Sequence, residues 1–294
     1  MERSLASKPL VWEEWATTLA QDLLEPEHRP GVPGPHRPEE FAARLYACEA
    51  LKPSPAADEP PEPYSLQWFL QIENYRHGKY GRWIPRLLEF VKHPGESLLG
   101  LGHGLGTDWL QYARHGTEVV VCSPSAEQLA LIRRNFELRG LRGRFVHAGF
   151  FALPLRNASI DVACVSSLLH EVDDPQVLVN EVYRVLKPGG KVIAVTAARF
   201  DVDFWHHLCF PLHRWLLGGR PAGPGRFTAR GMRQLFSQFV EHRVYKRHLR
   251  RREAPYQWRW LPLPLLERWM GRVLVMKAFK PLSAARGAVE KAAA

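Results

Sequence analysis

Five short apolar runs alternate with segments of helical periodicity between residues 96 and 197. The runs are almost continuously apolar, which is typical of strands that are buried on both faces of a parallel sheet. The intervening segments place apolar residues three or four positions apart, as in Leu129, Ile132 and Phe136. This alternation predicts an α/β fold with a doubly wound sheet. The predicted strands are 96–101, 117–122, 143–147, 159–166 and 191–197, and the predicted helices between them are 107–115, 125–139 and 174–186, the last ended by Lys187-Pro188-Gly189-Gly190.

Further elements are predicted on either side of this core. Helical periodicity precedes the first strand, and Thr228 has the residue type of an N-cap for a later helix. An aromatic and basic segment at 204–217 interrupts the alternation. The additional predicted helices are 65–75, 83–91 and 228–239, and the additional predicted strands are 241–248 and 273–279.

The first 63 residues differ in composition from the rest, because they hold 11 of the 24 prolines. Proline continues neither a helix nor a central strand. We therefore predict a proline-rich extension that is only partly helical, with Trp12 and Trp15 on one face of its first helix. The predicted helices of the extension are 12–24 and 38–51. The predicted domains are this extension at 1–63 and a folded domain at 64–294, with its core at 95–198 and an insertion and C-terminal antiparallel strands at 199–280.

Several classes of protein are disfavoured by the sequence. No apolar run approaches the roughly 20 residues of a membrane span, and the first residues lack the apolar region of a secretory signal. The cysteines, Cys48, Cys122, Cys164 and Cys209, are scattered, so neither a disulfide framework nor a zinc cluster is expected. These observations favour a soluble cytoplasmic protein.

The net charge of +10 is distributed unevenly. Residues 1–62 carry 12 acids and 6 bases, whereas nine Lys or Arg residues between 226 and 252 face a single acid, Glu241. A basic surface attracts nucleic acid, anionic lipid or an acidic ligand. A solvated charged face is the simpler interpretation.

A glycine-rich loop follows the first predicted core strand and opens a helix. It reads Gly100-Leu101-Gly102-His103-Gly104-Leu105-Gly106. Glycine lets the backbone approach a ligand, and a helix N-terminus offers unpaired N–H groups. The spacing departs from the dinucleotide pattern G-x-G-x-x-G, because Leu105 and Thr107 stand where the last glycine is needed. A nucleoside site of another sort and a simple tight turn both remain open.

Taken together, this loop and four other segments resemble the class I S-adenosylmethionine (SAM)-dependent methyltransferases, most closely the ubiquinone/menaquinone-biosynthesis type. The resemblance is good over about 75–197 and loose beyond. It implies a Rossmann-like, seven-stranded, mostly parallel sheet whose last two strands form an antiparallel pair, and it implies SAM as cofactor. The segments that carry it are 102–106, 116–122, 152–161, 169–175 and 184–191, the last reading Arg-Val-Leu-Lys-Pro-Gly-Gly-Lys.

Three acids that are usual in this family are replaced here. Gly100 stands two residues before the first glycine of the loop, Cys122 ends the strand whose acid holds the ribose, and Phe150 follows Gly149 where an acid meets the adenine. A hydrogen bond to a charged group contributes about 1.5–3 kcal/mol. Loss of the ribose carboxylate alone therefore predicts SAM binding that is roughly 10- to 150-fold weaker.

The resemblance also implies which residues meet the cofactor. Phe150 and Phe151 are expected to stack on the adenine or to fill its place, and Arg76 to pair with the carboxylate of SAM. His170 is expected to act as a general base or to line the acceptor site; a histidine at a helix entry that bonds to backbone is the alternative. The predicted cofactor-binding residues are Gly100, Gly102, His103, Gly104, Gly106, Cys122, Ser123, Phe150, Phe151, Ser166, Tyr75 and Arg76.

Three functions are consistent with these features. The first is methyl transfer from SAM to a small-molecule or lipid-like acceptor, for which the aromatic residues at 204–215 suit an apolar acceptor or peripheral contact with a membrane. The second is a catalytically inactive, methyltransferase-like binding or scaffold protein that has lost SAM affinity. The third, nucleic-acid binding or methylation, is disfavoured because aromatic residues are poorly interleaved with the basic ones.

Overall fold

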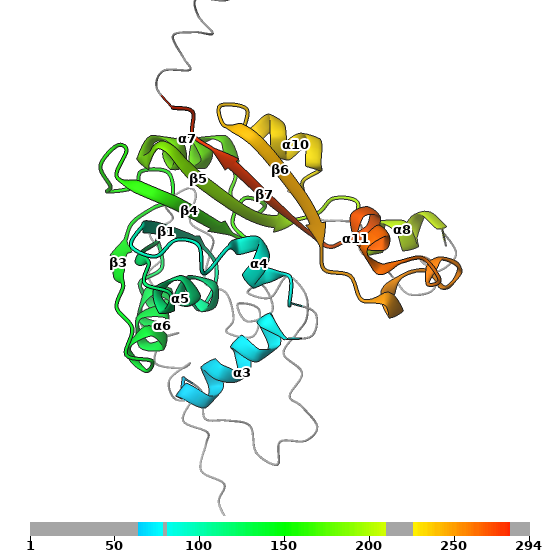
Figure 1. Cartoon of the computed structure of the whole chain (residues 1–294), viewed down its shortest axis with the longest axis horizontal. Coiled ribbons are helices and arrows are strands. Elements are labelled where there is room, and N and C mark those ends of the chain that lie inside the picture. Colours follow the sequence, from blue (N-terminus) through cyan, green and yellow to red (C-terminus); the bar gives the residue numbers. More distant parts are fainter. Residues whose placement is uncertain (1–63, 79–80, 210–225, 283–294) are drawn as a thin grey trace, which may run out of the picture. The chain divides into compact units, whose positions relative to one another are not determined.

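A seven-stranded sheet forms the centre of the protein, with the strand order β3-β2-β1-β4-β5-β7-β6 (Figure 1). The computed structural model describes residues 64–78, 81–209 and 226–282. Neighbouring strands from β3 to β5 are parallel, and β7 pairs antiparallel with both β5 and β6. The predicted α/β class, the seven strands and the antiparallel pair are therefore confirmed. The helices predicted at 12–24 and 38–51 lie outside the described residues.

The boundaries of most elements lie within a few residues of the predicted ones. The helix predicted at 228–239 is shorter, but Thr228 caps it as expected by accepting a hydrogen bond from the Gly231 N–H at 3.0 Å. The strands are β1 (Ser97–Gly102), β2 (Glu118–Ser123), β3 (Arg144–His147), β4 (Ile160–Ser166), β5 (Leu186–Ala197), β6 (Val240–Arg247) and β7 (Val273–Phe279). The helices are α3 (Leu66–His77), α4 (Ile84–Leu88), α5 (Thr107–Arg114), α6 (Ala126–Glu137), α7 (Pro175–Val185), α8 (Val202–Cys209), α10 (Ala229–Leu235) and α11 (Leu263–Met270), with 3₁₀ turns η1 (Arg251–Glu253) and η2 (Tyr256–Trp258).

Helices cover both faces of the sheet because successive strand residues point to opposite sides. On one face, Leu99 and Leu101 of β1 belong to a buried cluster that includes residues of α7 and α10. On the other face, Leu98 belongs to a cluster built with α4, α5 and α6. The near-continuous apolar runs of the sequence thus correspond to strands with two buried faces, and the doubly wound architecture is confirmed.

The segment 187–190 follows the end of α7, as predicted, but it already belongs to a strand. β5 begins at Leu186, five residues before the predicted strand 191–197. The pairing of β4 with β5 shifts register there, so the segment is a bulge. Gly189 has a φ of +79°, and a Cβ on Gly190 would lie 2.8 Å from the carbonyl oxygen of Lys187, so both positions need glycine. The same two glycines that break a helix therefore also permit a bulged strand.

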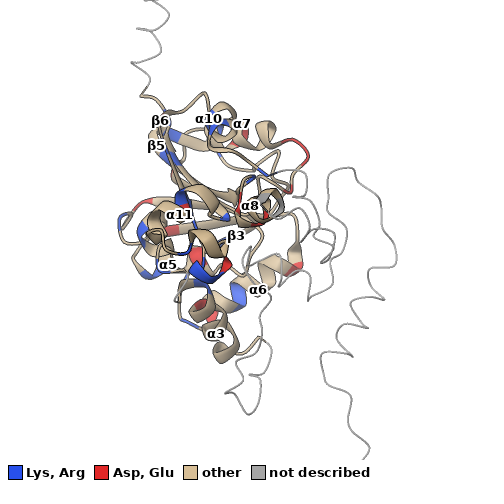
Figure 2. Cartoon of the chain, turned by 90° about the vertical axis from the view of Figure 1, so that its right-hand side faces the viewer, with Lys and Arg blue, Asp and Glu red and all other residues tan. Residues whose placement is uncertain are grey.

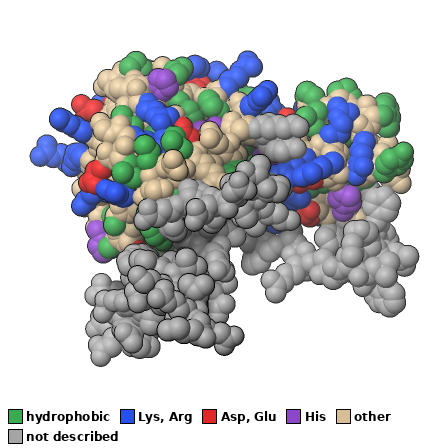
Figure 3. Space-filling view, turned by 90° about the horizontal axis from the view of Figure 1, so that it is seen from below, with side chains coloured by type: hydrophobic (Ala, Val, Ile, Leu, Met, Phe, Trp, Pro, Cys, Tyr) green, Lys and Arg blue, Asp and Glu red, His purple; other side chains and the backbone are tan. Residues whose placement is uncertain are grey.

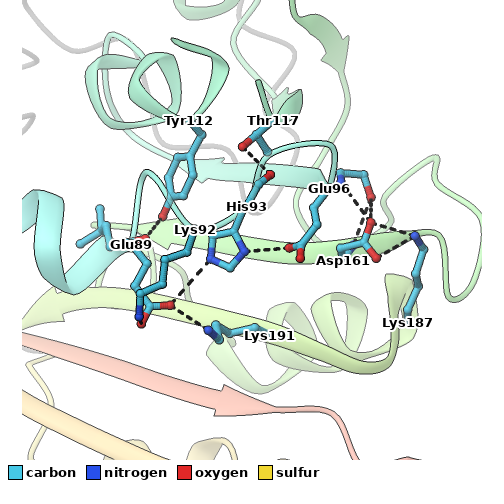
Figure 4. A network of polar contacts seen from close by, with 11 residues as sticks. Glu89, Lys92, His93, Glu96, Tyr112, Thr117, Asp161, Lys187 and Lys191 are labelled. Atoms are coloured by element: carbon cyan, nitrogen blue, oxygen red, sulfur yellow. Dashed lines mark hydrogen bonds and ion pairs between the residues drawn. The ribbon is translucent and has the colours of Figure 1, made fainter. Parts of the chain in front are cut away.

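A buried carboxylate joins α4 to the sheet. Glu89, at the C-terminal end of α4, accepts hydrogen bonds from Nζ of Lys191 at 2.7 Å and of Lys92 at 3.1 Å (Figure 4). It also accepts one from Nζ of Lys277 at 2.8 Å. Burial alone would raise the pKa of Glu89, but the three lysines outweigh it and lower this pKa to about 2. The carboxylate therefore stays ionised and ties α4 to β5 and β7.

A long connection separates the last two strands. This β6–β7 connection, residues 248–272, contains η1, η2 and α11. Leu249, Ala254, Leu266 and Met270 form a small apolar cluster with Val202 of α8, so the connection and α8 pack together (Figure 1). Among the described residues, no helix is long and apolar enough to cross a membrane.

Candidate active site

The candidate site lies at the carboxyl ends of β1 and β4. β2 lies on one side of β1 and β4 lies on the other, so the order of the strands along the chain reverses between β1 and β4. Doubly wound sheets bind their ligands at such a switch point. A solvent-open hollow is found here. Its lining consists of Arg76, His103, Gly104, Leu105, Gly106, Thr107, Asp108, Trp109 and Ser166.

Two glycines of the loop are required by its backbone path. Gly102 has a φ of +144°, and a Cβ there would lie 1.9 Å from the carbonyl oxygen of Ser166 on β4. Gly106 is the N-cap of α5 with a φ of +72°, and its Cβ would lie 2.7 Å from Cγ2 of Ile132. Both glycines let β1 turn sharply into α5, whose first residues line the hollow. The close packing of the backbone therefore accounts for these two glycines, whether or not a ligand approaches the loop.

Gly100 lies against a buried tryptophan. A Cβ on Gly100 would lie 2.7 Å from Cδ2 of Trp109, and Gly100 is not among the residues that line the hollow. The Trp109 ring is buried against β1 and occupies the space into which a side chain at position 100 would extend. The acid that is usual at this position therefore has no room here, and Gly100 serves to admit the tryptophan.

Asp108 is a site residue that sequence reasoning missed. It is the second residue of α5, and its Oδ1 accepts a hydrogen bond of 2.6 Å from Nε of Arg76, while Nη2 of Arg76 pairs with Oδ2. Nε2 of His77 lies 3.1 Å from Oδ1. Burial alone would raise the pKa of Asp108, but Arg76 and His77 hold it well below its usual range. The hollow therefore contains a fixed carboxylate beside a guanidinium.

Ion pairs between α3 and the helices after the loop fix the position of Arg76. Glu73, one turn before Arg76 on α3, pairs with Arg114 of α5 at 2.8 Å and with Arg139, just after α6, at 2.5 Å. Figure 2 shows acidic and basic residues close together where α3 meets α5. Tyr75, predicted to close over the cofactor, is exposed on α3 and does not line the hollow.

The end of β2 carries no anionic group. Cys122 is fully buried in the core, and burial raises its pKa to about 11, so the thiol is neutral. The Ser123 hydroxyl donates to Oε1 of Gln128 at 2.6 Å. Nε2 of Gln128 donates to the carbonyl oxygens of Gly102 at 3.0 Å and Gly104 at 2.9 Å. Gln128, which the sequence did not single out, thus ties the glycine loop to β2.

The two phenylalanines predicted near the adenine differ in exposure. Phe150 is buried in the core and packs edge-on against His103, with ring centroids 6.1 Å apart. Phe151 is exposed. Neither lines the hollow. Phe150 therefore packs in the core and supports the His103 ring.

A second polar group lies beside the hollow. Glu171 places Oε2 3.3 Å from Nε2 of His103 and Oε1 3.7 Å from Nε2 of His170. Nδ1 of His170 lies 3.2 Å from Oγ1 of Thr196 on β5. Burial, together with the charge of Arg226, lowers the pKa of His170 to about 4. A neutral imidazole is thus held at the carboxyl edge of the sheet, and its low pKa makes it a weak base.

We expect His170 to remain neutral throughout the physiological pH range. Its lowered pKa predicts that its ring resonances move near pH 4 in an NMR titration, and a His170→Gln variant identifies them. Because the folded protein resists protonation of this ring, the contribution of His170 to stability is complete above about pH 6.5 and declines as pH falls toward 4. Resonances of His170 that titrate near pH 6.5 would contradict this assignment.

The described residues fit the two ends of SAM unequally. Arg76 and Asp108 suit a carboxylate and an ammonium of an amino-acid group, and the loop offers main-chain groups beside them. The nucleoside end meets neutral groups only, because Cys122 is an uncharged thiol and Gln128 is bonded to the loop. The residues therefore fit the methionine end of the cofactor, and no carboxylate supports the ribose at the end of β2.

Comparison with known proteins agrees with the sheet and the loop. Residues 98–194 match the family model of a methyltransferase domain. The chain is 31% identical to a demethylmenaquinone methyltransferase of Thermus thermophilus over 39% of this chain and 53% of that protein. It is 28% identical to a ubiquinone/menaquinone biosynthesis C-methyltransferase of Cereibacter sphaeroides over 40% of this chain and 49% of that protein. The chain thus spans about half the length of the curated relatives it matches.

Solved structures share the fold. The [4+2]-cyclase SpnF aligns with a TM-score of 0.51 at 21% identity, covering 69% of this chain and 81% of that one. A SAM-dependent methyltransferase from Aquifex aeolicus aligns with a TM-score of 0.51 at 13% identity, covering 73% and 98%. The expected resemblance to class I SAM-dependent methyltransferases is confirmed, and SAM is the cofactor that this family and fold imply.

Proposed function

We propose that this chain transfers a methyl group from SAM to a small, apolar, quinone-like acceptor. The observation that carries the proposal is the Arg76–Asp108 pair, which lines the hollow beside the glycine loop. It supplies charged partners for a cofactor at a place where the usual acids are absent. Support for the acceptor class comes from the relatives named for demethylmenaquinone and for ubiquinone/menaquinone biosynthesis.

The roles proposed for the residues follow from their positions. SAM, when bound, supplies a methyl group already activated on a sulfonium, so catalysis depends mainly on alignment. Arg76 would hold its carboxylate and Asp108 its ammonium, while Gly104 and Gly106 leave room for the ligand. His170, as a neutral imidazole, would line the acceptor site, and Glu171 would orient His103.

Calorimetric titration of the full-length protein with SAM and with its demethylated product tests the cofactor site. Because the ribose lacks a carboxylate partner, we expect saturable binding that is weaker than in relatives with the ribose acid, by roughly 10- to 150-fold. If neither ligand produces heat at high protein concentration, the chain is the non-catalytic, methyltransferase-like binding protein instead.

Transfer of a radiolabelled methyl group tests the acceptor. We expect label in the organic phase when a reduced demethylated naphthoquinone or benzoquinone is added. An oligonucleotide serves as the comparison and is expected to stay unlabelled. Label in the oligonucleotide alone would overturn the proposed acceptor class while leaving the cofactor site intact. The cytoplasmic location expected from the sequence stays a prediction.

A further inference from the structure

The β6–β7 connection presents large aromatic side chains to solvent. Tyr256 is 82% exposed and Trp260 is 77% exposed, which are the largest fractions among the aromatic residues of the described chain. Leu265 and Trp269 are also exposed and lie one turn apart on α11. Exposed apolar groups concentrated on one short segment typically mark an interaction surface.

These residues are not needed to fill the interior of the connection. Leu249, Ala254, Leu266 and Met270 already form its core with Val202. The partly buried Trp205 and Trp258 pack against that core, with Trp205 donating from Nε1 to the carbonyl oxygen of Trp269 at 3.2 Å. The interior of the connection is therefore already filled, and the exposed aromatic residues have no packing role within it.

The charges among these aromatic residues are of one sign. The exposed charged side chains of the β6–β7 connection are arginines alone, and its two acids, Glu253 and Glu267, are half-buried. Oε2 of Glu253 accepts the N–H of Arg250 at 3.0 Å, and Oε2 of Glu267 lies 4.0 Å from Nε of Arg247. Figure 3 shows hydrophobic and basic side chains interleaved on the right-hand part of the molecule. The exposed arginines are Arg251, Arg252, Arg259 and Arg268.

Two of these arginines stiffen the surface without losing their charge. Arg251 donates from Nη1 to the carbonyl oxygen of Leu261 at 3.1 Å, and Arg259 donates from Nε to that of Ala254 at 2.9 Å. Cζ of Arg259 also lies 5.8 Å from the ring centroid of Tyr256. Carbonyl oxygens and an aromatic ring hold the guanidinium groups in place but do not neutralise them.

We infer that the β6–β7 connection docks on the surface of an anionic lipid bilayer. Trp and Tyr side chains favour the headgroup level of a membrane, since one part of the ring is apolar and the other is polar. Arginine pairs with lipid phosphates, and anionic headgroups attract clustered basic residues. The mixture of Trp, Tyr, Leu and Arg without an exposed acid matches this surface better than it matches nucleic acid, which needs no apolar stripe.

The docking surface lies at the same edge of the sheet as the hollow. Ala197, at the end of β5, pairs with Val273, where the connection enters β7, and Thr196 beside His170 pairs with Leu274. A membrane-bound molecule would thus have its hollow near the lipid. The binding itself does not depend on the proposed methyl transfer, but this placement would give a quinone-like acceptor a short path to the site.

Flotation of the full-length protein with vesicles tests the inference. With vesicles of phosphatidylcholine containing one third phosphatidylglycerol, we expect the protein to float, and with phosphatidylcholine alone to float much less. Raised salt should release it. Tyr256→Ala combined with Trp260→Ala should weaken binding at least about tenfold. Arg252→Gln combined with Arg268→Gln should weaken it by roughly 25-fold, at about fivefold for each arginine.

The matched control removes two exposed arginines from α4 and the turn before it. Arg82→Gln combined with Arg86→Gln makes the same change in net charge and should leave flotation within about twofold of the unchanged protein. Equal loss in the control, or equal binding to neutral and anionic vesicles, would overturn the inference. So would self-association in sedimentation that the Trp260→Ala change abolishes without any vesicle binding, because the surface would then join two copies of the chain.

Discussion

Replacing Arg76 by glutamine is expected to weaken SAM binding by about 10- to 150-fold, the value of a hydrogen bond to a charged group. The guanidinium is the cation that α3 brings to the hollow, and a neutral amide pairs with a ligand carboxylate far less well. Calorimetric titration of SAM against the unchanged protein and the variant measures the difference. Arg76→Lys keeps the charge and loses the forked geometry, so it should fall between the two.

A matched variant separates this effect from a general loosening of α3. Arg114→Gln removes the 2.8 Å pair with Glu73 between α5 and α3, but Arg114 does not line the hollow. It should bind SAM as the unchanged protein does. Arg76→Gln removes the cation that pairs with the buried Asp108 carboxylate, so it is expected to lower stability. Thermal unfolding therefore checks that each variant is folded before its SAM affinity is compared. Equal SAM affinity in Arg76→Gln and in the unchanged protein would show that the pair serves the fold alone.

The sheet could be predicted because its strands are buried on both faces. Residues 98–101 and 119–122 are apolar on both faces of their strands. In the structure, the side chains on one face belong to one buried cluster and those on the other face to a second cluster. The bulge at 187–190 could not be predicted, since Pro and Gly signal the end of a helix with or without a strand that follows. Its pairing depends on contacts with Lys280, whose carbonyl oxygen accepts the Gly189 N–H at 2.9 Å.

The candidate site could be predicted only in part. The loop is predictable because its glycines lie close together in the sequence, and Arg76 because a cation is expected near the carboxylate of SAM. Asp108 is not predicted, because it stands at none of the positions 100, 122 and 150 at which the family usually has acids. The signal was available, since an acid in the first turn of the helix after the loop points toward the same hollow.

Side-chain packing also changed the interpretation of two positions. The sequence shows that Gly100 and Cys122 replace acids, but only the structure shows why they do not serve as weak substitutes. Trp109 fills the space beside Gly100, and Cys122 is fully buried. Both changes are built into the core, so restoring one acid by mutation would bury a charge or displace a ring.

Replacing Glu89 by glutamine is expected to destabilise the protein by about 3–5 kcal/mol, the usual cost of removing one partner from a buried ion pair. Lys277 and Lys191 point at this carboxylate from β7 and β5, and Lys277 is itself buried. Without the carboxylate their charges would lie in the interior with little compensation. Chemical denaturation at pH 7 measures the free energy of unfolding of the variant and of the unchanged protein.

Lys92→Gln is the matched control, because Lys92 contacts the same carboxylate at 3.1 Å but its side chain is 62% exposed. It should cost less than about 1 kcal/mol. The pH dependence distinguishes charge from packing. The pKa of Glu89 is lowered to about 2, so its contribution is complete above about pH 4.5 and is lost as pH falls toward 2. That part of the acid-induced loss should be absent in Glu89→Gln, and a variant whose stability declines just as steeply between pH 4.5 and 2 would show that the lysines do not depend on this charge.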